Sequence, residues 1–200
     1  MAVDKRKKVV IAIPTGGNIH HKVVGVLSHL LLNTTKYKLD TYISKMVGIG
    51  EHRNVIVKDF LEGKADYLLM IDSDNPPPLN VLDLVELDKP VIGLPTPINM
   101  DWIQGMTEIF YNIFKDGLPV KQRGQGLEEV EAVGSGVILI RRDVLEKIKH
   151  PFTTVRNEDD LRTVGTDTAF CMKCKKNKIK VYTHWDYKCS HFKTINLATL

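Results

Sequence analysis

The chain has 200 residues, 43% of them hydrophobic and 26% charged, and its formal net charge is +4. These values are typical of one folded domain spanning residues 1–200, and they exclude the strong basic charge of a dedicated nucleic-acid-binding protein. Three cysteines, an odd number, argue against a disulfide framework and for a reducing compartment.

The N-terminal residues, MAVDKRKKVVIAIPTGG, contain a single apolar run, Val9 to Ile13. This run is too short for the core of a signal peptide and much too short to span a bilayer. We therefore expect no transmembrane segment and a cytoplasmic protein.

The first half of the chain alternates between apolar runs typical of buried strands and segments with helical periodicity. The expected strands are residues 8–14, 39–47, 67–71 and 90–95, and the expected helices are residues 21–32, 51–61 and 79–87. Short buried strands that alternate with helices indicate an α/β fold with a mostly parallel, Rossmann-like sheet and helices on both faces. In such sheets, ligands bind beyond the carboxyl ends of the strands.

The second half of the chain is less regular. A Lys-Asp-Gly sequence at residues 115–117, between two short apolar runs, predicts a small β-hairpin. Residues 131–148 predict a strand followed by a helix. A further helix is expected to begin at Asp167, and residues 179–185 are expected to form the last strand.

The segment DYLLMIDSDNPPP, Asp66 to Pro78, places two carboxylates directly after a buried strand. In extended backbone, Asp72 and Asp74 point to the same side, roughly 6.5–7 Å apart, so both could address one ligand. Two carboxylates repel a phosphate-rich ligand unless a divalent cation lies between them. The other interpretation is a simple turn, because Asp, Ser and Pro are all favoured in turns.

The segment YLLMIDSDNPPP resembles the DXD segment of GT-A-fold glycosyltransferases, enzymes that use nucleotide-diphosphate sugars. Four other segments resemble parts of that family in the same order. IAIPTGG is similar to its opening strand and nucleotide-binding loop, GIGEHRNVIVKDFLEGKADYLLMID to its Arg-Asn helix, VEAVGSGVILIRRDVLEKI to its Gly-x-Gly strand and helix, and GTDTAFCMKCKKNKIKVYTHWDYKCSHF to its closing acidic helix, strand and histidine. The resemblance covers most of residues 9–192 and implies one GT-A-like domain, with a nucleotide-binding half at about residues 9–98 and an acceptor and metal half at residues 99–192.

The resemblance implies a metal-dependent glycosyltransferase that moves a sugar from a nucleotide-diphosphate sugar to a hydroxyl of a glycan, protein or lipid acceptor. Asp74 and His191 would ligate the divalent cation, Mn²⁺ or Mg²⁺, and Asp72 would contact the metal or the ribose. Asp167 would be the general base toward the acceptor in an inverting reaction. The donor pocket would be lined by Pro14, Thr15 and Gly16, with Arg53 and Asn54 nearby.

Two other functions stay open on the sequence. A sugar nucleotidyltransferase is one, although the Gly-rich loop with an arginine expected of that class is missing, since PTGGNIHHK contains no arginine. A non-catalytic nucleotide- or glycan-binding protein with a structural zinc is the other. Its zinc ligands would be Cys171, Cys174, Cys189 and His191.

The role of Asp167 and the roles of three histidines also stay open. Asp167 could simply cap its helix, and where the family often has Glu-Asp this chain has Thr166-Asp167. His20, His21 and His29 have no spacing that indicates a role.

Overall fold

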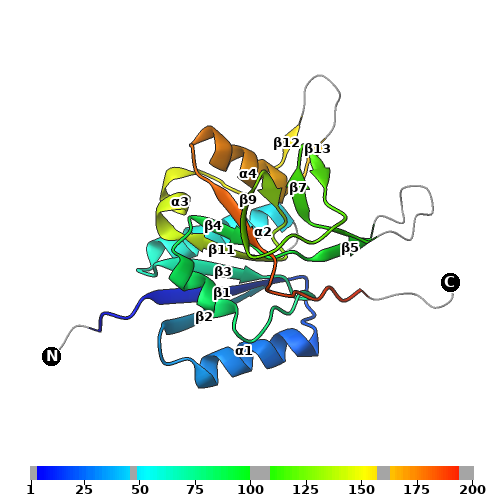
Figure 1. Ribbon diagram of the computed structural model, residues 1–200. Coiled ribbons are helices and arrows are strands. Elements are labelled where there is room, and N and C mark those ends of the chain that lie inside the picture. Colours follow the sequence, from blue (N-terminus) through cyan, green and yellow to red (C-terminus); the bar gives the residue numbers. More distant parts are fainter. Residues whose placement is uncertain (1–3, 46–48, 100–108, 157–162, 194–200) are drawn as a thin grey trace.

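A seven-stranded sheet separates two layers of helices in the computed structural model, which describes residues 4–45, 49–99, 109–156 and 163–193 (Figure 1). The strand order is β2-β1-β3-β11-β4-β14-β9. These strands are β1 (Lys8–Thr15), β2 (Lys38–Lys45), β3 (Tyr67–Ile71), β4 (Val91–Gly93), β9 (Leu127–Val130), β11 (Val137–Arg141) and β14 (Val181–His184).

Five of the seven strands point the same way, which confirms the mostly parallel sheet expected from the sequence. β1 pairs in parallel with β2 and β3, and β14 pairs in parallel with β4. β11 is antiparallel to both of its neighbours, β3 and β4, and β9 is antiparallel to β14. Because β11 runs backwards, the residues that precede it lie at the edge of the sheet where β1, β3 and β4 end.

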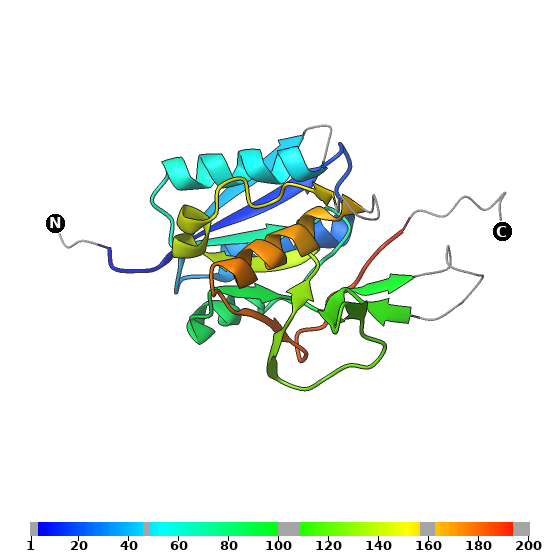
Figure 2. The same cartoon turned by 90° about the horizontal axis from the view of Figure 1, so that it is seen from above.

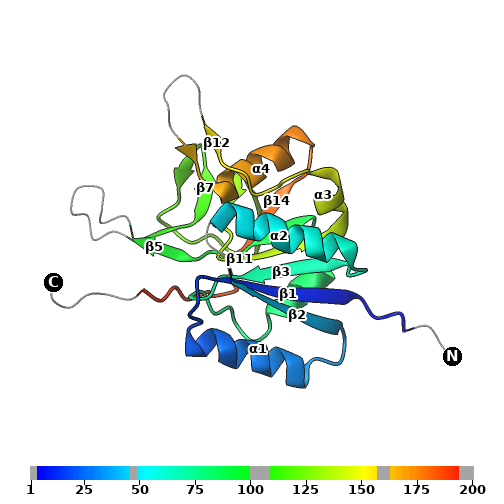
Figure 3. The same cartoon turned by 180° about the vertical axis from the view of Figure 1, so that it is seen from behind.

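Helices cover both faces of the sheet, as the sequence predicts. α1 (His21–Asn33) and the 3₁₀ helix η1 (Val81–Leu87) pack on one face, whereas α2 (Ile49–Glu62), α3 (Arg142–Lys147) and α4 (Thr166–Lys176) pack on the other. Seen from above, α2, α3 and α4 lie in front of the strands (Figure 2), and the view from behind shows α1 at the opposite side of the sheet (Figure 3).

The central strand β3 shows how the sequence forms two cores. All five of its residues are buried, because successive side chains point to opposite faces and both faces are covered. Leu68 and Met70 join the core beneath α2, α3 and α4, while Tyr67, Leu69 and Ile71 join the core beneath α1.

A small β region extends the second half of the chain. β7 (Ile113–Lys115) and β8 (Leu118–Pro119) form the predicted hairpin, and β10 (Ala132–Val133) adds a third strand. Its turn residues, Asp116 and Gly117, both have positive φ, 51° and 73°, as the favoured two-residue hairpin turns require. Two further pairs complete it: β5 (Pro97–Asn99) with β6 (Ile109–Tyr111), and β12 (Val155–Arg156) with β13 (Thr163–Val164).

The helices have ordinary lengths for a globular domain. Among the residues that the structure describes, none of them combines the length and the apolar composition needed to cross a bilayer.

Candidate functional site

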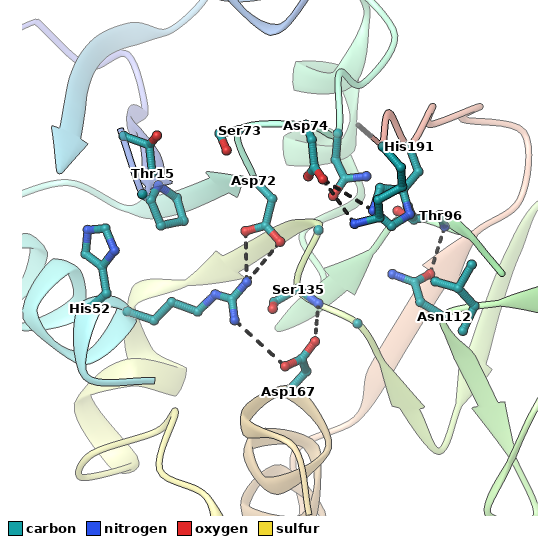
Figure 4. Close-up of a pocket in the computed structure, with 18 residues that line it drawn as sticks. Thr15, His52, Asp72, Ser73, Asp74, Thr96, Asn112, Ser135, Asp167 and His191 are labelled. Atoms are coloured by element: carbon teal, nitrogen blue, oxygen red, sulfur yellow. Dashed lines mark hydrogen bonds and ion pairs between the residues drawn. The ribbon is translucent and has the colours of Figure 1, made fainter. Parts of the chain in front are cut away.

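A cavity of about 680 Å³ opens at the edge of the sheet where the parallel strands end. This volume lies within the usual range for small-molecule sites, and the position is the one expected for ligands of open α/β sheets. Its wall combines the end of β1, the loop after β3, the first turns of α2 and α4, the loop between β10 and β11, and the C-terminal segment (Figure 4).

Eight of the nine site residues predicted from the sequence line this one cavity. They are Pro14, Thr15, Gly16, Arg53, Asp72, Asp74, Asp167 and His191. The ninth, Asn54, is the neighbour of Arg53 but does not itself line the cavity: its side-chain oxygen accepts a hydrogen bond from the backbone N–H of Phe152 at 3.0 Å. Successive residues on a helix point about 100° apart, so the turn that aims Arg53 into the cavity directs Asn54 elsewhere.

Two glycines allow the backbone to close the floor of the cavity. The backbone N–H of Asp72 donates to the carbonyl of Gly136 at 2.7 Å, which joins the loop after β3 to the start of β11. A Cβ atom at Gly136 would lie 2.8 Å from Asn75 Oδ1, and one at Gly134 would overlap the side chain of Asn112. Both glycines of the Gly-Ser-Gly sequence are therefore required, because the backbone there lies too close to Asn75 and Asn112 to leave room for a side chain.

Arg53 links two carboxylates inside the cavity. Its Nη2 donates to Asp72 Oδ1 at 2.8 Å and to Asp72 Oδ2 at 3.0 Å, and its Nη1 lies 3.8 Å from Asp167 Oδ1. The Arg53 side chain is only 5% exposed. A buried guanidinium of this kind is stable only with such partners, so the α2 helix and the β3 strand are coupled through charge.

Burial dominates the titration of Asp72. Desolvation raises the pKa of this carboxyl to about 6, with Arg53 acting in the opposite direction and the charges of Asp167 and Asp74 adding to the rise. A folded-state pKa above the unfolded value means that the folded protein binds the proton more tightly. The contribution of Asp72 to stability is therefore present below the unfolded pKa and is lost as the pH rises toward 6.

Asp72→Asn is expected to change how stability depends on pH. The free energy of unfolding of the wild type minus that of the variant should fall between pH 4.5 and pH 7, because only the wild type must ionise a desolvated carboxyl in this interval. Urea unfolding at several pH values measures the difference. Asp143→Asn is the control: Arg141 lowers the pKa of Asp143, so that carboxyl is ionised throughout this interval and its difference should stay flat. A flat difference for Asp72 as well would contradict the raised pKa.

Asp74 lies with two basic side chains at the other end of the cavity. Its Oδ2 is 3.5 Å from His191 Nε2 and 3.2 Å from Lys193 Nζ. His191 lowers the pKa of Asp74, and Lys193 lowers it further against the effect of burial. The ring of His191 is oriented by a 2.8 Å hydrogen bond from Nδ1 to the carbonyl of Pro97.

The contacts of these residues test whether a cation fits. In the described part of the chain, no three His, Cys, Asp or Glu side chains form a metal-binding group, and Asp72 is directed to Arg53 instead. The predicted set of three protein ligands is thus not assembled, but the pair of Asp74 and His191 fits. A carbonyl only accepts, so the contact with Pro97 takes the proton-bearing Nδ1 of His191, and Nε2 is the ring atom left to ligate a cation beside Asp74, as in metal-ligating histidines. Carboxylate with imidazole suits Mn²⁺ or Mg²⁺ completed by ligand oxygens.

The alternative zinc site is wrong. Cys171 and Cys174 are buried in the core beneath α2, α3 and α4, whereas Cys189 is buried in the core on the opposite face of the sheet. Burial raises the pKa of Cys171 and of Cys189 to about 12, which disfavours the thiolate that zinc requires. These cysteines are core residues, and His191 is free to serve the cavity.

Asp167 does not cap its helix, so the capping interpretation is wrong. The N-cap of α4 is Gly165, and Asp167 lies in the first turn. Its Oδ2 accepts the backbone N–H of Ser135 at 3.0 Å, and its Oδ1 accepts the hydroxyl of Thr166 at 2.9 Å. Thr166, the residue that departs from the family pattern, therefore orients the carboxylate toward the cavity.

Three buried polar atoms of the cavity wall lack a hydrogen-bond partner within the described residues: His52 Nε2, Arg53 Nε and Ser135 Oγ. Unsatisfied buried polar atoms are rare in proteins because each costs free energy, so the wall of this cavity carries polar groups that are not used to stabilise the fold. The sequence offered no signal for His52. Ser135 was inside the Gly-Ser-Gly segment that resembles the family, but nothing marked its hydroxyl.

Comparisons with known proteins identify the fold. No protein-family model matches the sequence, and no curated protein matches it. Among solved structures, A197 from STIV aligns with a TM-score of 0.65 and 22% identity, over 94% of this chain and 86% of that one. A glycosyltransferase involved in the glycosylation of the major capsid of PBCV-1 aligns with a TM-score of 0.54 and 14% identity, over 96% and 95%. The chain has a GT-A-like fold.

Further matches show how widely this GT-A-like fold is shared. S. aureus TarS 1–349 in complex with UDP aligns with a TM-score of 0.53 and 14% identity over 92% of this chain, which spans only 60% of the TarS chain. UDP-glucose pyrophosphorylase from Acinetobacter baumanii aligns with a TM-score of 0.52 and 6% identity, over 92% and 87%. Glycosyltransferases and nucleotidyltransferases thus both have it, and the distinction between them depends on the site.

Proposed function

We propose that this protein is a metal-dependent glycosyltransferase that moves a sugar from a nucleotide-diphosphate sugar to an acceptor hydroxyl. One observation carries the proposal: a single cavity holds a pair suited to a divalent cation, Asp74 and His191, and a separate carboxylate, Asp167. The diphosphate of a sugar donor needs the cation, and the hydroxyl of an acceptor needs a carboxylate that can take its proton. The names of two structures with the same fold support it, since one is a glycosyltransferase and TarS is in complex with UDP.

The donor would lie along the end of β1. Pro14, Thr15 and Gly16 form the wall there, and Asp72 lies beside them, held by Arg53. The hydroxyl of Thr15 already donates to the carbonyl of Asn18 at 2.8 Å, so base and ribose would meet backbone groups and the Asp72 carboxylate. UDP is the first nucleotide to test, because TarS, which has the same fold, is in complex with UDP.

Transfer requires stabilisation of the negative charge on the leaving diphosphate and removal of the proton from the acceptor hydroxyl. A bound Mn²⁺ or Mg²⁺ supplies Lewis-acid stabilisation of the diphosphate as it leaves. Asp74 and His191 would hold the cation, and a cation bound at Asp74 Oδ2 would compete with the contact that Lys193 makes there. Asp167, oriented by Ser135 and Thr166, accepts the proton of the acceptor hydroxyl in an inverting reaction.

The second candidate is a sugar nucleotidyltransferase, which the shared fold of UDP-glucose pyrophosphorylase keeps open. The loop after β1 contains no arginine, unlike the loop expected of that class. The products separate the two: a glycosyltransferase releases UDP when an acceptor is glycosylated, whereas a nucleotidyltransferase makes UTP from UDP-sugar and pyrophosphate. Formation of UTP without acceptor would overturn the proposal in favour of this candidate.

Mn²⁺ with UDP is expected to raise the melting temperature, and EDTA should abolish the rise. A ligand at one hundred times its dissociation constant adds about 2.7 kcal/mol, which corresponds to roughly 5–10 °C for a domain of this size. Asp74→Asn should remove the dependence on Mn²⁺, while Asp143→Asn, outside the cavity, should behave as the wild type. No shift with UDP or with any other nucleoside diphosphate would contradict a donor site.

A further inference from the structure

The C-terminal segment, residues 189–193, runs antiparallel to the turn that carries Asp74. The N–H of Ser190 donates to the carbonyl of Pro76 at 3.3 Å, and the N–H of Phe192 donates to the carbonyl of Asp74 at 2.9 Å. These two pairs, 190 with 76 and 192 with 74, keep one antiparallel register. The side chain of Asn75 adds a 3.1 Å hydrogen bond to the carbonyl of Ser190.

The register assigns alternate side chains of this segment to opposite sides. In an extended segment, residues two apart share a side. His191 and Lys193 accordingly line the cavity and contact Asp74. Phe192 faces the other way: its ring stacks on His20, with centroids 4.0 Å apart and planes 10° apart, and Lys22 Nζ lies 4.9 Å from its centroid.

His20 is a fixed platform for this stack. Its side chain accepts a hydrogen bond from the N–H of Lys22 and caps α1, and its own N–H donates to the carbonyl of Ser73 at 2.8 Å. The ring on which Phe192 rests is therefore tied both to α1 and to the Asp-Ser-Asp turn. No role could be assigned to this histidine from the sequence, because it lies 172 positions before Phe192.

We propose that Phe192 is a positioning residue for the cation site, an inference that rests on the proposed function. Its stacking on His20 holds residues 189–193 against the Asp74 turn, and so keeps the ring of His191 beside the Asp74 carboxylate. The segment has neither helix nor strand of its own and few backbone hydrogen bonds. Such a segment opens readily unless side chains anchor it: Cys189 is buried in the core at its start, and Phe192 anchors the end that carries His191 and Lys193, on the side opposite the cavity.

Hydrogen exchange of the full-length protein tests the anchor without any metal. In Phe192→Ala, the amide of residue 192 should exchange about 10-fold faster than in the wild type, because the aromatic contact that keeps its bond to Asp74 closed is lost. Phe192→Tyr retains the ring and should restore protection. Phe114→Ala removes a half-buried phenyl ring from β7, outside the cavity wall, and should leave this amide unchanged. Unchanged exchange in Phe192→Ala overturns the proposal.

Binding of Mn²⁺ in the presence of UDP, followed by electron paramagnetic resonance of the free ion, tests the consequence. Phe192→Ala should bind Mn²⁺ about 10-fold more weakly, as expected when the support of a ligating histidine is removed, and Phe192→Tyr and Phe114→Ala should bind as the wild type. Faster exchange with undiminished Mn²⁺ binding would overturn the positioning role. A wild type that binds no Mn²⁺ would refute the metal in the proposed function and, with it, the role of Phe192 in positioning a metal ligand. Hydrogen exchange at residue 192 would still show whether Phe192 anchors the segment.

Discussion

Asp167→Asn is expected to lower the rate of sugar transfer by about 10³-fold and to leave the affinity for Mn²⁺ and UDP unchanged. General-base catalysis contributes typically 10²–10⁴-fold, and an amide cannot accept the proton. Asparagine has the same shape, and its side-chain oxygen can still accept the hydrogen bond from Ser135 that orients this position. Steady-state kinetics with the acceptor and a thermal shift with UDP measure the two quantities separately.

The same variant discriminates among the functions compatible with the fold. A binding protein would show no transfer in either form, and a nucleotidyltransferase would not use a base directed at an acceptor. Asp143→Asn, whose carboxylate pairs with Arg141 on the surface of α3, should retain full activity. A rate for Asp167→Asn within tenfold of the wild type would contradict its assignment as the base.

Most of the first half of the chain was predictable because β1, β3 and β4 form from short continuous apolar runs. β3 has the bounds expected for it, residues 67–71, and the carboxylates that follow lie at the cavity because a strand must end where its apolar run ends. The helix expected near residues 79–87 is a short 3₁₀ helix, Val81–Leu87. The prolines before it disfavour the helical backbone conformation in the residue that precedes each of them, so the helix cannot extend back toward β3.

The partners of the site residues could not be read from the sequence, because they depend on helix phase and on distant pairings. Arg53 and Asn54 are adjacent, yet only Arg53 reaches the cavity. The backbone N–H of Ser135 reaches Asp167 because β11 is inserted antiparallel beside β3, and no local sequence pattern predicts that insertion. The stacking of Phe192 on His20 likewise depends on a pairing of residues far apart in the sequence.

Arg53→Met is expected to destabilise the protein by about 3–5 kcal/mol at pH 8. The substitution leaves the partly buried carboxylate of Asp72, whose side chain is 28% exposed, without its buried cation, and an uncompensated charge in a desolvated site has this effect. Arg141→Met is the matched control, since Arg141 pairs with Asp143 at the surface with a third of its side chain exposed and should cost at most about 1 kcal/mol. Urea unfolding of both variants measures the difference.

The dependence of this loss on pH shows where it comes from. Without Arg53, the pKa of Asp72 rises above its value of about 6, so the folded variant takes up a proton and the penalty shrinks as the pH falls toward 5. Arg53→Met/Asp72→Asn should recover most of the stability at pH 8, because the charge itself is gone. A loss below about 1 kcal/mol, or no recovery in the double variant, would contradict the coupling. Recovery of stability together with weaker UDP binding would mean that Asp72 contacts the ligand at a cost in stability, and that Arg53 offsets the desolvation of its carboxylate.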